Sequence, residues 1–181
     1  TYGWTQDEVD RIGKLPSVSG VEGSVTLDVI ADFNGTGEDK VYRLHTIPDE
    51  AFDLESDSSE YLMSLDFSYN DLTELPKTFH AGHIPYLYGL ELSYNEFSKF
   101  PYQALDCSGL TVFGIRGQRD KNGERCLSEW PQGIYQHVGL RGFYIGSNNL
   151  GKIDDTISPI CYYLEVSDNP NLILDASNVC Y

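Results

Sequence analysis

The sequence predicts a solenoid of short parallel strands, and two adjacent segments with the same apolar pattern predict it. LMSLDFSYNDLTELP, from Leu62, and LYGLELSYNEFSKFP, from Leu87, carry Leu or Phe at the same offsets. Asn70 of the first matches Asn95 of the second, and both segments end in Pro. The stride is 25 residues. Two neighbouring copies this similar indicate a repeat protein.

Three weaker copies follow the first two. The third begins at Leu110, but its second half reappears only at Leu127. About seven residues are therefore inserted around GQRDKNGER, and we expect this charged segment, Gln118 to Arg125, to project from an edge where a partner could contact it. The fourth copy begins at Leu140 and the fifth at Cys161. Stacked repeats share a core that one repeat cannot bury alone, so we expect about five repeats over residues 61–181.

Each L-x-x-L-x-L stretch is predicted to be a short strand whose alternate residues face inward. A short amide side chain at the following turn can bond backbone groups that the bend leaves unpaired. We therefore assign a structural role to the turn asparagines Asn70, Asn95, Asn148 and Asn169. The apolar residues expected to return to the core from the convex side are Phe79, Leu105, Ile134 and Ile157.

Residues 1–60 are predicted to form an N-terminal arm and a divergent first repeat or cap. Ser24 to Phe33 reads SVTLDVIADF and alternates like a strand, and the later LHTIPDEAF resembles the second half of a repeat. Terminal repeats are expected to be atypical because their outer faces meet water. We interpret residues 20–60 as a divergent repeat or a capping hairpin, and residues 1–19 as a short helix or an ordered arm.

The repeats also carry a resemblance to a known family. LDFSYNDLTELP and LELSYNEFSKFP resemble the leucine-rich-repeat family, and IPDEAF and LDCSGLTVFGI are similar to repeats of its bacterial cell-surface members. The resemblance implies an α/β-type leucine-rich-repeat solenoid with parallel strands on the concave face and irregular, short helical or 3-10 segments on the convex face. It also implies a non-catalytic module that holds a protein on the concave sheet, and export to the cell surface, tethered to the outer membrane, or to the extracellular space.

The repeat register predicts which side chains face solvent on the concave sheet. The central position of successive strands should place Asp66, Glu91, Gly114, Tyr144 and Glu165 in one column. Tyrosines beside charges suit binding, because they offer a large amphipathic area with little entropy to lose. An ordinary solvated sheet with scattered tyrosines is the alternative. The candidate binding residues are Asp66, Tyr88, Glu91, Arg116, Arg141, Tyr144, Tyr163 and Glu165.

The composition of the chain limits the classes of partner that it can bind. The formal net charge is -16, and the acidic residues are spread along the chain. Such a surface repels phosphate backbones, so we expect no nucleic-acid partner. No apolar run approaches the about 18 residues that a membrane span needs. A protein is the favoured partner, a glycan-binding accessory domain is the alternative that the tyrosine-rich face favours, and a structural spacer in a longer surface protein also stays open.

The four cysteines include no C-x-x-C, so we expect no structural zinc site. Cys107 and Cys161 occupy inward positions and are interpreted as small core residues. The alternative is a pair of disulfides, Cys161–Cys180 and Cys107–Cys126, which an exported protein can form.

Metal and catalytic signals are weak. One Gly-containing loop alternates oxygen ligands at a spacing that can hold calcium, although an ordinary turn explains the same residues, Asp32, Asn34, Thr36 and Glu38. His80 and His83 lie three apart, but a solvated loop explains them better than a ligand pair. G-x-S-x-G, H-E-x-x-H and G-x-x-x-x-G-K-[ST] are all missing, so we expect neither an enzyme nor a cofactor.

Overall fold

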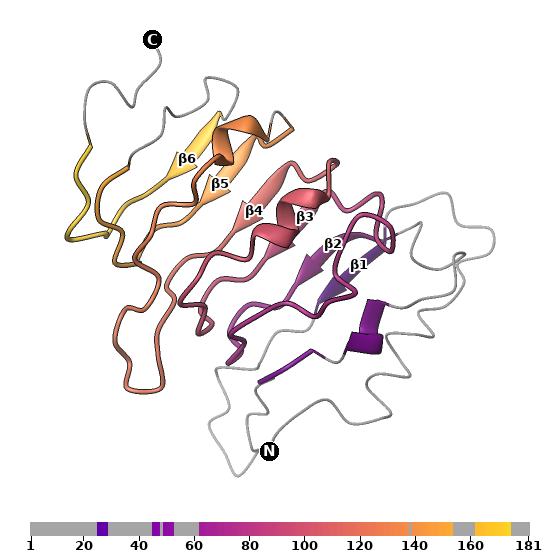
Figure 1. Ribbon diagram of the computed structural model, residues 1–181, viewed down its shortest axis with the longest axis horizontal. Helices are drawn as coiled ribbons and strands as arrows, with labels where there is room; N and C mark the ends of the chain where they lie inside the picture. The colour runs from indigo at the N-terminus through magenta and orange to yellow at the C-terminus, as the bar shows by residue number, and fades with distance from the viewer. Residues whose placement is uncertain are drawn as a thin grey trace.

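The computed structural model describes residues 25–28, 45–47, 49–52, 62–137, 139–153 and 162–174. Within them, one parallel sheet contains, in chain order, β1 (Val25–Asp28), β2 (Leu62–Asp66), β3 (Gly89–Glu91), β4 (Val112–Gly114), β5 (Gly142–Tyr144) and β6 (Tyr163–Glu165). The 3-10 helices of the same residues are η1 (Asp49–Phe52), η2 (Tyr102–Asp106) and η3 (Ile134–Gln136). Figure 1 shows the strands side by side in chain order. The chain is a stacked-coil solenoid with little helix.

The strands pair in the register that the repeats predict. Asp66 pairs with Glu91, Glu91 with Gly114, and the column continues through Tyr144 to Glu165. The neighbouring column, one residue earlier in each strand, is apolar and packs inward: Leu65, Leu90, Phe113, Phe143 and Leu164. Alternate residues of a strand point to opposite faces, so the Asp66 column lies on the concave face. The predicted alignment of that column is confirmed.

The core lies between the sheet and the returning segments of the convex side. Phe79 and Ile134 are buried there, as predicted. Leu105 is only partly buried, because in η2 the side chain that faces the core is that of Ala104. Ile157 lies outside the described residues. Among the residues that are described, no helix is long and apolar enough to cross a membrane.

The N-terminal part contributes β1, which is parallel to β2, with Asp28 opposite Asp66. Parallel pairing is how one repeat lies beside the next. Whether residues 20–60 form a divergent repeat or a capping hairpin stays a prediction. Ile47 and Phe52 are buried in the same core, as the second half of a repeat would be. The predicted arm over residues 1–19 and the calcium candidates Asp32, Asn34, Thr36 and Glu38 lie outside the described residues.

Candidate functional site

Each of the five coils of β2 to β6 turns at the end of its strand through a residue with a positive φ angle. These residues are Tyr69 (59°), Tyr94 (60°), Gly117 (62°), Ser147 (55°) and Asp168 (53°). This left-handed conformation is easy for glycine and costly for most other residues. Five coils repeat it at the same place, so the turn is a requirement of the stack. We call the strip formed by these turns the turn edge.

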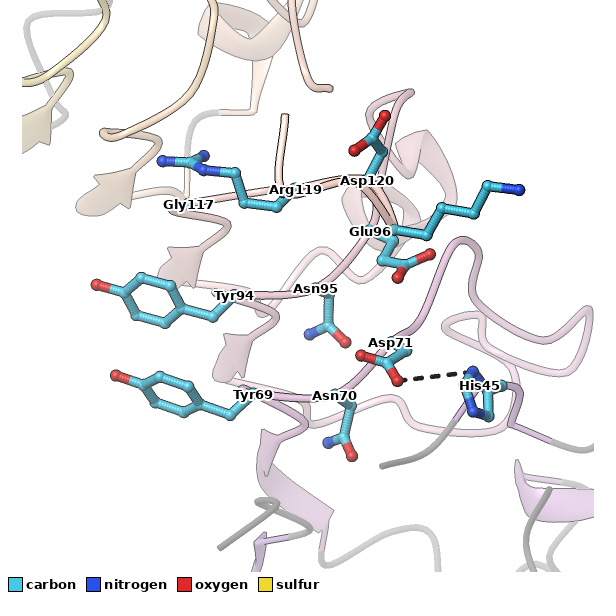
Figure 2. A pocket seen from close by; sticks show the side chains of 12 residues that line it. His45, Tyr69, Asn70, Asp71, Tyr94, Asn95, Glu96, Gly117, Arg119 and Asp120 are labelled. Carbon is cyan, nitrogen blue, oxygen red and sulfur yellow. Dashed lines mark ion pairs between the residues drawn. The ribbon is translucent and has the colours of Figure 1, made fainter. Parts of the chain in front are cut away.

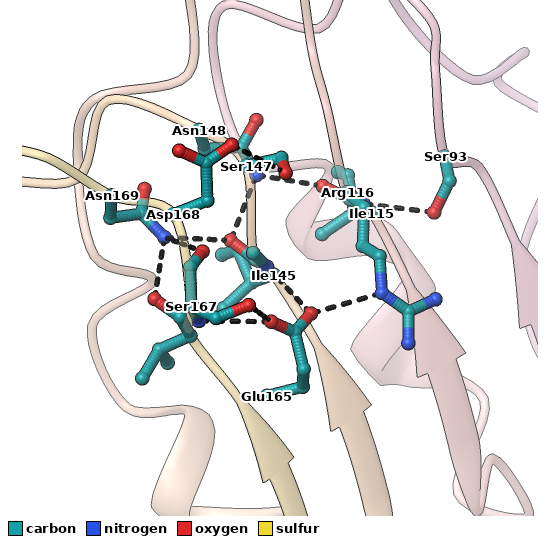
Figure 3. Close-up of polar contacts among 12 residues, drawn as sticks. Ser93, Ile115, Arg116, Ile145, Ser147, Asn148, Glu165, Ser167, Asp168 and Asn169 are labelled. Atoms are coloured by element: carbon teal, nitrogen blue, oxygen red, sulfur yellow. Dashed lines mark hydrogen bonds and ion pairs between the residues drawn. The ribbon is translucent and has the colours of Figure 1, made fainter.

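A buried amide follows each left-handed residue, and in the coils of β3 to β6 this amide joins two coils. In Asn95, Oδ1 accepts a hydrogen bond from the backbone N–H of Leu72 at 3.0 Å, while Nδ2 donates to the carbonyls of Phe67 (2.9 Å) and Leu92 (3.0 Å). Asn148 and Asn169 make equivalent bonds (Figure 3). Asn70, in the first of these coils, donates to the carbonyls of its own turn. The four asparagines thus hold the backbone of the turns.

The third coil uses Gln118 at this position, which corrects the view of Gln118 as part of a projecting insertion. Its side chain is fully buried. Oε1 accepts from the N–H of Phe97 at 3.0 Å, and Nε2 donates to the carbonyl of Leu92 at 2.9 Å. The available signal was position: Gln118 follows Ile115 by three residues, as Asn95 follows Leu92.

The rest of the insertion is a hairpin that binds back to its own chain. Arg119 and Arg125 pair in an antiparallel bridge at its base. The Arg119 guanidinium donates to the carbonyl of Ser147 at 2.6 Å, and Arg125 forms an ion pair with Asp168 at 2.7 Å. Hydrogen bonds from Arg125 and then Ser147 lower the pKa of Asp168. The two arginines therefore fasten the fourth and fifth coils, while the tip over residues 121–124 is exposed.

The acidic side chains of the concave column accept hydrogen bonds from the backbone just beyond the ends of their own strands. Asp66, Glu91 and Glu165 each accept a hydrogen bond from the backbone N–H of the serine two residues later, at 2.9 Å in all three cases. Glu91 lies over Gly114, where a Cβ would come within 2.1 Å of its carboxylate. Glu165 lies over Gly146 in the same way. These acids combine a local structural role with a place on the concave face.

Three candidate binding residues form one contact cluster on this face, Arg116, Tyr144 and Glu165. Figure 3 shows the contact between Arg116 and Glu165. Arg116 Nε lies 2.9 Å from Glu165 Oε2, and the guanidinium carbon lies 4.3 Å from the centre of the Tyr144 ring. A guanidinium over an aromatic face is attracted by the ring electrons. Burial acts to raise the pKa of Glu165, but hydrogen bonds from Ser167 and Arg116 lower it overall. The cluster is charged and half-buried.

The remaining concave candidates lie in or just before β3, β5 and β6. Tyr88 is 48% exposed just before β3, and Tyr163 is 68% exposed in β6. Arg141 lies just before β5, and its guanidinium carbon is 5.3 Å from the centre of the Tyr162 ring. Arg116 follows β4 whereas Arg141 precedes β5, so the two arginines occupy opposite ends of the strands. The structure therefore gives two separate Arg–Tyr pairs on one face.

A hollow of about 600 Å³ runs along the turn edge (Figure 2). The rings of Tyr69 and Tyr94 line it and stack with their centroids 4.5 Å apart and an interplanar angle of 16°. Asp71 and Glu96 also line it, one in each coil, and His45 lies 3.7 Å from Asp71. Burial and then Tyr94 raise the pKa of Tyr69. Sequence reasoning missed this groove because it considered only strand positions, although Tyr-Asn recurs in the first two repeats.

Both described cysteines have free thiols, so the candidate disulfide Cys107–Cys126 is wrong. The two residues lie beyond opposite ends of β4. Cys107 is fully buried before the strand, as the core interpretation predicts, and burial raises the pKa of its thiol to about 11. Cys126 donates to the carbonyl of Phe97 at 3.4 Å after the strand. The candidate pair Cys161 and Cys180 lies outside the described residues.

His80 and His83 make structural contacts in a convex loop. His83 Nδ1 lies 2.6 Å from the carbonyl of Phe52, and His80 Nδ1 accepts from the N–H of Gly82 at 3.1 Å. Across the described part of the chain, no group of three or more His, Cys, Asp or Glu residues is arranged to hold a metal ion.

The fold agrees with comparisons to known proteins. No family model matches the sequence, and no curated protein does. A leucine-rich repeat protein from Bacteroides thetaiotaomicron VPI-5482 is 39% identical over 75% of this chain, with a TM-score of 0.71. Another leucine-rich repeat protein, from Bacteroides eggerthii DSM 20697, is 43% identical over 74%, with a TM-score of 0.69. The chain belongs to the leucine-rich-repeat family. It spans 17% and 22% of the lengths of those two leucine-rich-repeat chains.

Proposed function

We propose that this leucine-rich-repeat chain is a non-catalytic module that binds a protein partner through its concave sheet, as part of an exported surface protein. The observation that carries the proposal is the Arg116–Tyr144–Glu165 cluster, together with the exposed side chains of Tyr88 before β3 and Tyr163 in β6. Aromatic residues and arginine dominate binding energy at protein interfaces, because they combine large buried area with directional polar contacts. The export part of the proposal is supported by the resemblance to bacterial cell-surface repeats.

The test is a pull-down from host or envelope extract, with the full chain as bait. A variant that combines Tyr88→Ala, Glu91→Gln and Tyr144→Ala should lose at least tenfold in affinity for the captured protein, because it removes two aromatic contacts and one charge. Tyr86→Ala with Asp106→Ala is the matched control, since both residues are exposed but lie outside the strands. Unchanged capture by the concave variant, with its circular dichroism spectrum intact, would contradict concave binding.

A glycan is the second candidate ligand, and the stacked Tyr69–Tyr94 pair in the turn-edge groove favours it. A flat aromatic ring offers a sugar an apolar surface, and the neighbouring carboxylates can accept hydrogen bonds from hydroxyls. The second arm of the same experiment applies these baits to a glycan array. Array hits that Tyr94→Ala removes and the concave variant keeps would support the glycan candidate. No binding in either arm would support a structural spacer.

A further inference from the structure

The Arg116 guanidinium is held in one orientation on the concave face. Its Nε donates to Glu165 Oε2 at 2.9 Å, and its guanidinium carbon lies over the Tyr144 ring, 4.3 Å from the centroid. The backbone is held as well, because the N–H of Arg116 donates to Ser93 Oγ at 2.9 Å. A long side chain that is fixed in this way has already lost much of the rotamer freedom that binding would otherwise cost.

The unused donors of this guanidinium are its two terminal amino groups. Figure 3 shows them pointing away from Glu165, and in the described part of the chain they bond to no other residue. Both oxygens of Glu165 are occupied: Oε1 accepts from the N–H of Ser167, and Oε2 accepts from Arg116 and from the N–H of Gly146 at 3.2 Å. This end of the concave column therefore presents donors to solvent, even though the column is acidic in composition.

We propose that Arg116 is the anchor of the concave site and binds a carboxylate of the protein partner through these two amino groups. The planar guanidinium fork matches a carboxylate with two parallel N–H···O bonds. A phosphate dianion fits less well, because the local charge of Arg116 is already shared with Glu165 and the chain as a whole carries -16. The inference rests on the proposed concave binding and names its partner chemistry.

The proposal reverses what the net charge alone would favour. An acidic protein attracts basic partners at long range, and that attraction governs the rate of encounter more than the contacts in the complex. At Arg116 the contact geometry favours an acidic group, and only 32% of the side chain is exposed, so water competes less for the guanidinium. The charge of the partner residue that contacts Arg116 therefore distinguishes the two expectations: an acidic residue supports the contact geometry, and a basic residue supports the net-charge argument.

The experiment selects a random peptide library, displayed on phage, against the immobilised full chain. Peptides that bind should be enriched in Asp or Glu, or should need a free C-terminal carboxylate. Synthetic copies with Glu→Gln, Asp→Asn or an amidated C-terminus identify which carboxylate is used. Arg116→Lys keeps the ion pair with Glu165 but loses the planar fork, so the selected peptides should bind it at least tenfold more weakly. Arg119→Met, a turn-edge arginine of the same coil, should bind them as the wild type does.

Other outcomes overturn the inference. They are enrichment of Lys and Arg in the selected peptides, equal binding to Arg116→Lys and the wild type, or no peptide above background. The variant Tyr88→Ala with Glu91→Gln leaves the Arg116 cluster intact and tests the broader proposal separately. Peptides that this double variant and Arg116→Lys both bind as well as the wild type does would show binding elsewhere, and concave recognition itself would fail. Peptides that the double variant alone loses would leave concave recognition standing without the Arg116 anchor.

Discussion

The turn edge is built in two ways along the solenoid. In the coils of β2 and β3 the left-handed residues are Tyr69 and Tyr94, whose rings stack. In the coils of β5 and β6 they are Ser147 and Asp168, which bond to each other at 2.9 Å and are fastened by Arg125. We call these the aromatic half and the charged half. The same backbone turn serves both, so the fold needs the turn but not a particular side chain on it.

The difference bears on the aromatic half. Aspartate tolerates the left-handed conformation through local hydrogen bonds, whereas a tyrosine there costs about 1–2 kcal/mol relative to an extended conformation. Two successive tyrosines therefore occupy strained positions that the charged half shows can be filled by small polar residues. Strain that the fold does not require points to a use of the two stacked rings, in the groove that they line.

The largest expected effect concerns the buried amide side chains that follow the left-handed residues, which both halves share. Asn95→Ala and Asn148→Ala should each lower the free energy of unfolding by about 3 kcal/mol, because each leaves buried N–H and C=O groups unpaired at about 1–3 kcal/mol per group. Urea denaturation followed by circular dichroism measures it. Asn122→Ala at the exposed hairpin tip is the control and should stay within about 0.5 kcal/mol of the wild type. A large loss for only one of the two buried asparagines would show that the halves differ beneath the surface.

A smaller expected effect is on the pH dependence of the free energy of unfolding, which should differ between the aromatic half and the charged half. The pKa of Asp168 is lowered in the folded protein by hydrogen bonds from Arg125 and Ser147. A carboxylate of this kind stabilises the fold above its unfolded pKa, about 3.9, and the contribution is lost as the pH falls through the folded pKa. The pKa of Tyr69 is raised by burial and by Tyr94, so its contribution is complete below the unfolded value, about 10, and is lost as the pH rises beyond it.

The measurement is urea denaturation of two variants across the pH range. Asp168→Asn should be less stable than the wild type at pH 7, and the two should converge in acid below the folded pKa of Asp168. Tyr69→Phe should differ from the wild type by a constant amount below pH 10 and gain on it above that pH. Parallel profiles for either variant and the wild type would mean that the residue concerned has the same pKa folded and unfolded.

The sequence predicted those parts of the molecule in which the same residue types recur at fixed spacings. Leu and Phe recur at fixed offsets, so the inward column and its register followed directly, and the concave column with it. Gln118 was not predicted as a turn amide, because glutamine stands there in place of asparagine. Its side chain is one methylene longer but carries the same amide group. The left-handed turns at Tyr69 and Tyr94 were not predicted, because a tyrosine in the sequence does not indicate a positive φ angle. The groove and the Arg116–Glu165 pair depend on side chains from different coils, so their geometry appears only when the coils are stacked.

The smallest effect tests the strain argument directly. Tyr94→Gly and Tyr94→Ala both remove the stacked ring, but only glycine adopts φ 60° without cost, so the glycine variant should be more stable than the alanine variant by about 1 kcal/mol. Loss of stacking costs about 0.5–1.5 kcal/mol, so Tyr94→Gly should remain near the wild type in urea denaturation. In the charged half, Asp168→Gly loses the bonds to Arg125 and Ser147 and should be less stable than the wild type. A Tyr94→Gly variant that loses more than about 2 kcal/mol would make the tyrosine pair a structural element, because loss of stacking alone could not account for it. The aromatic half would then need no ligand to explain it.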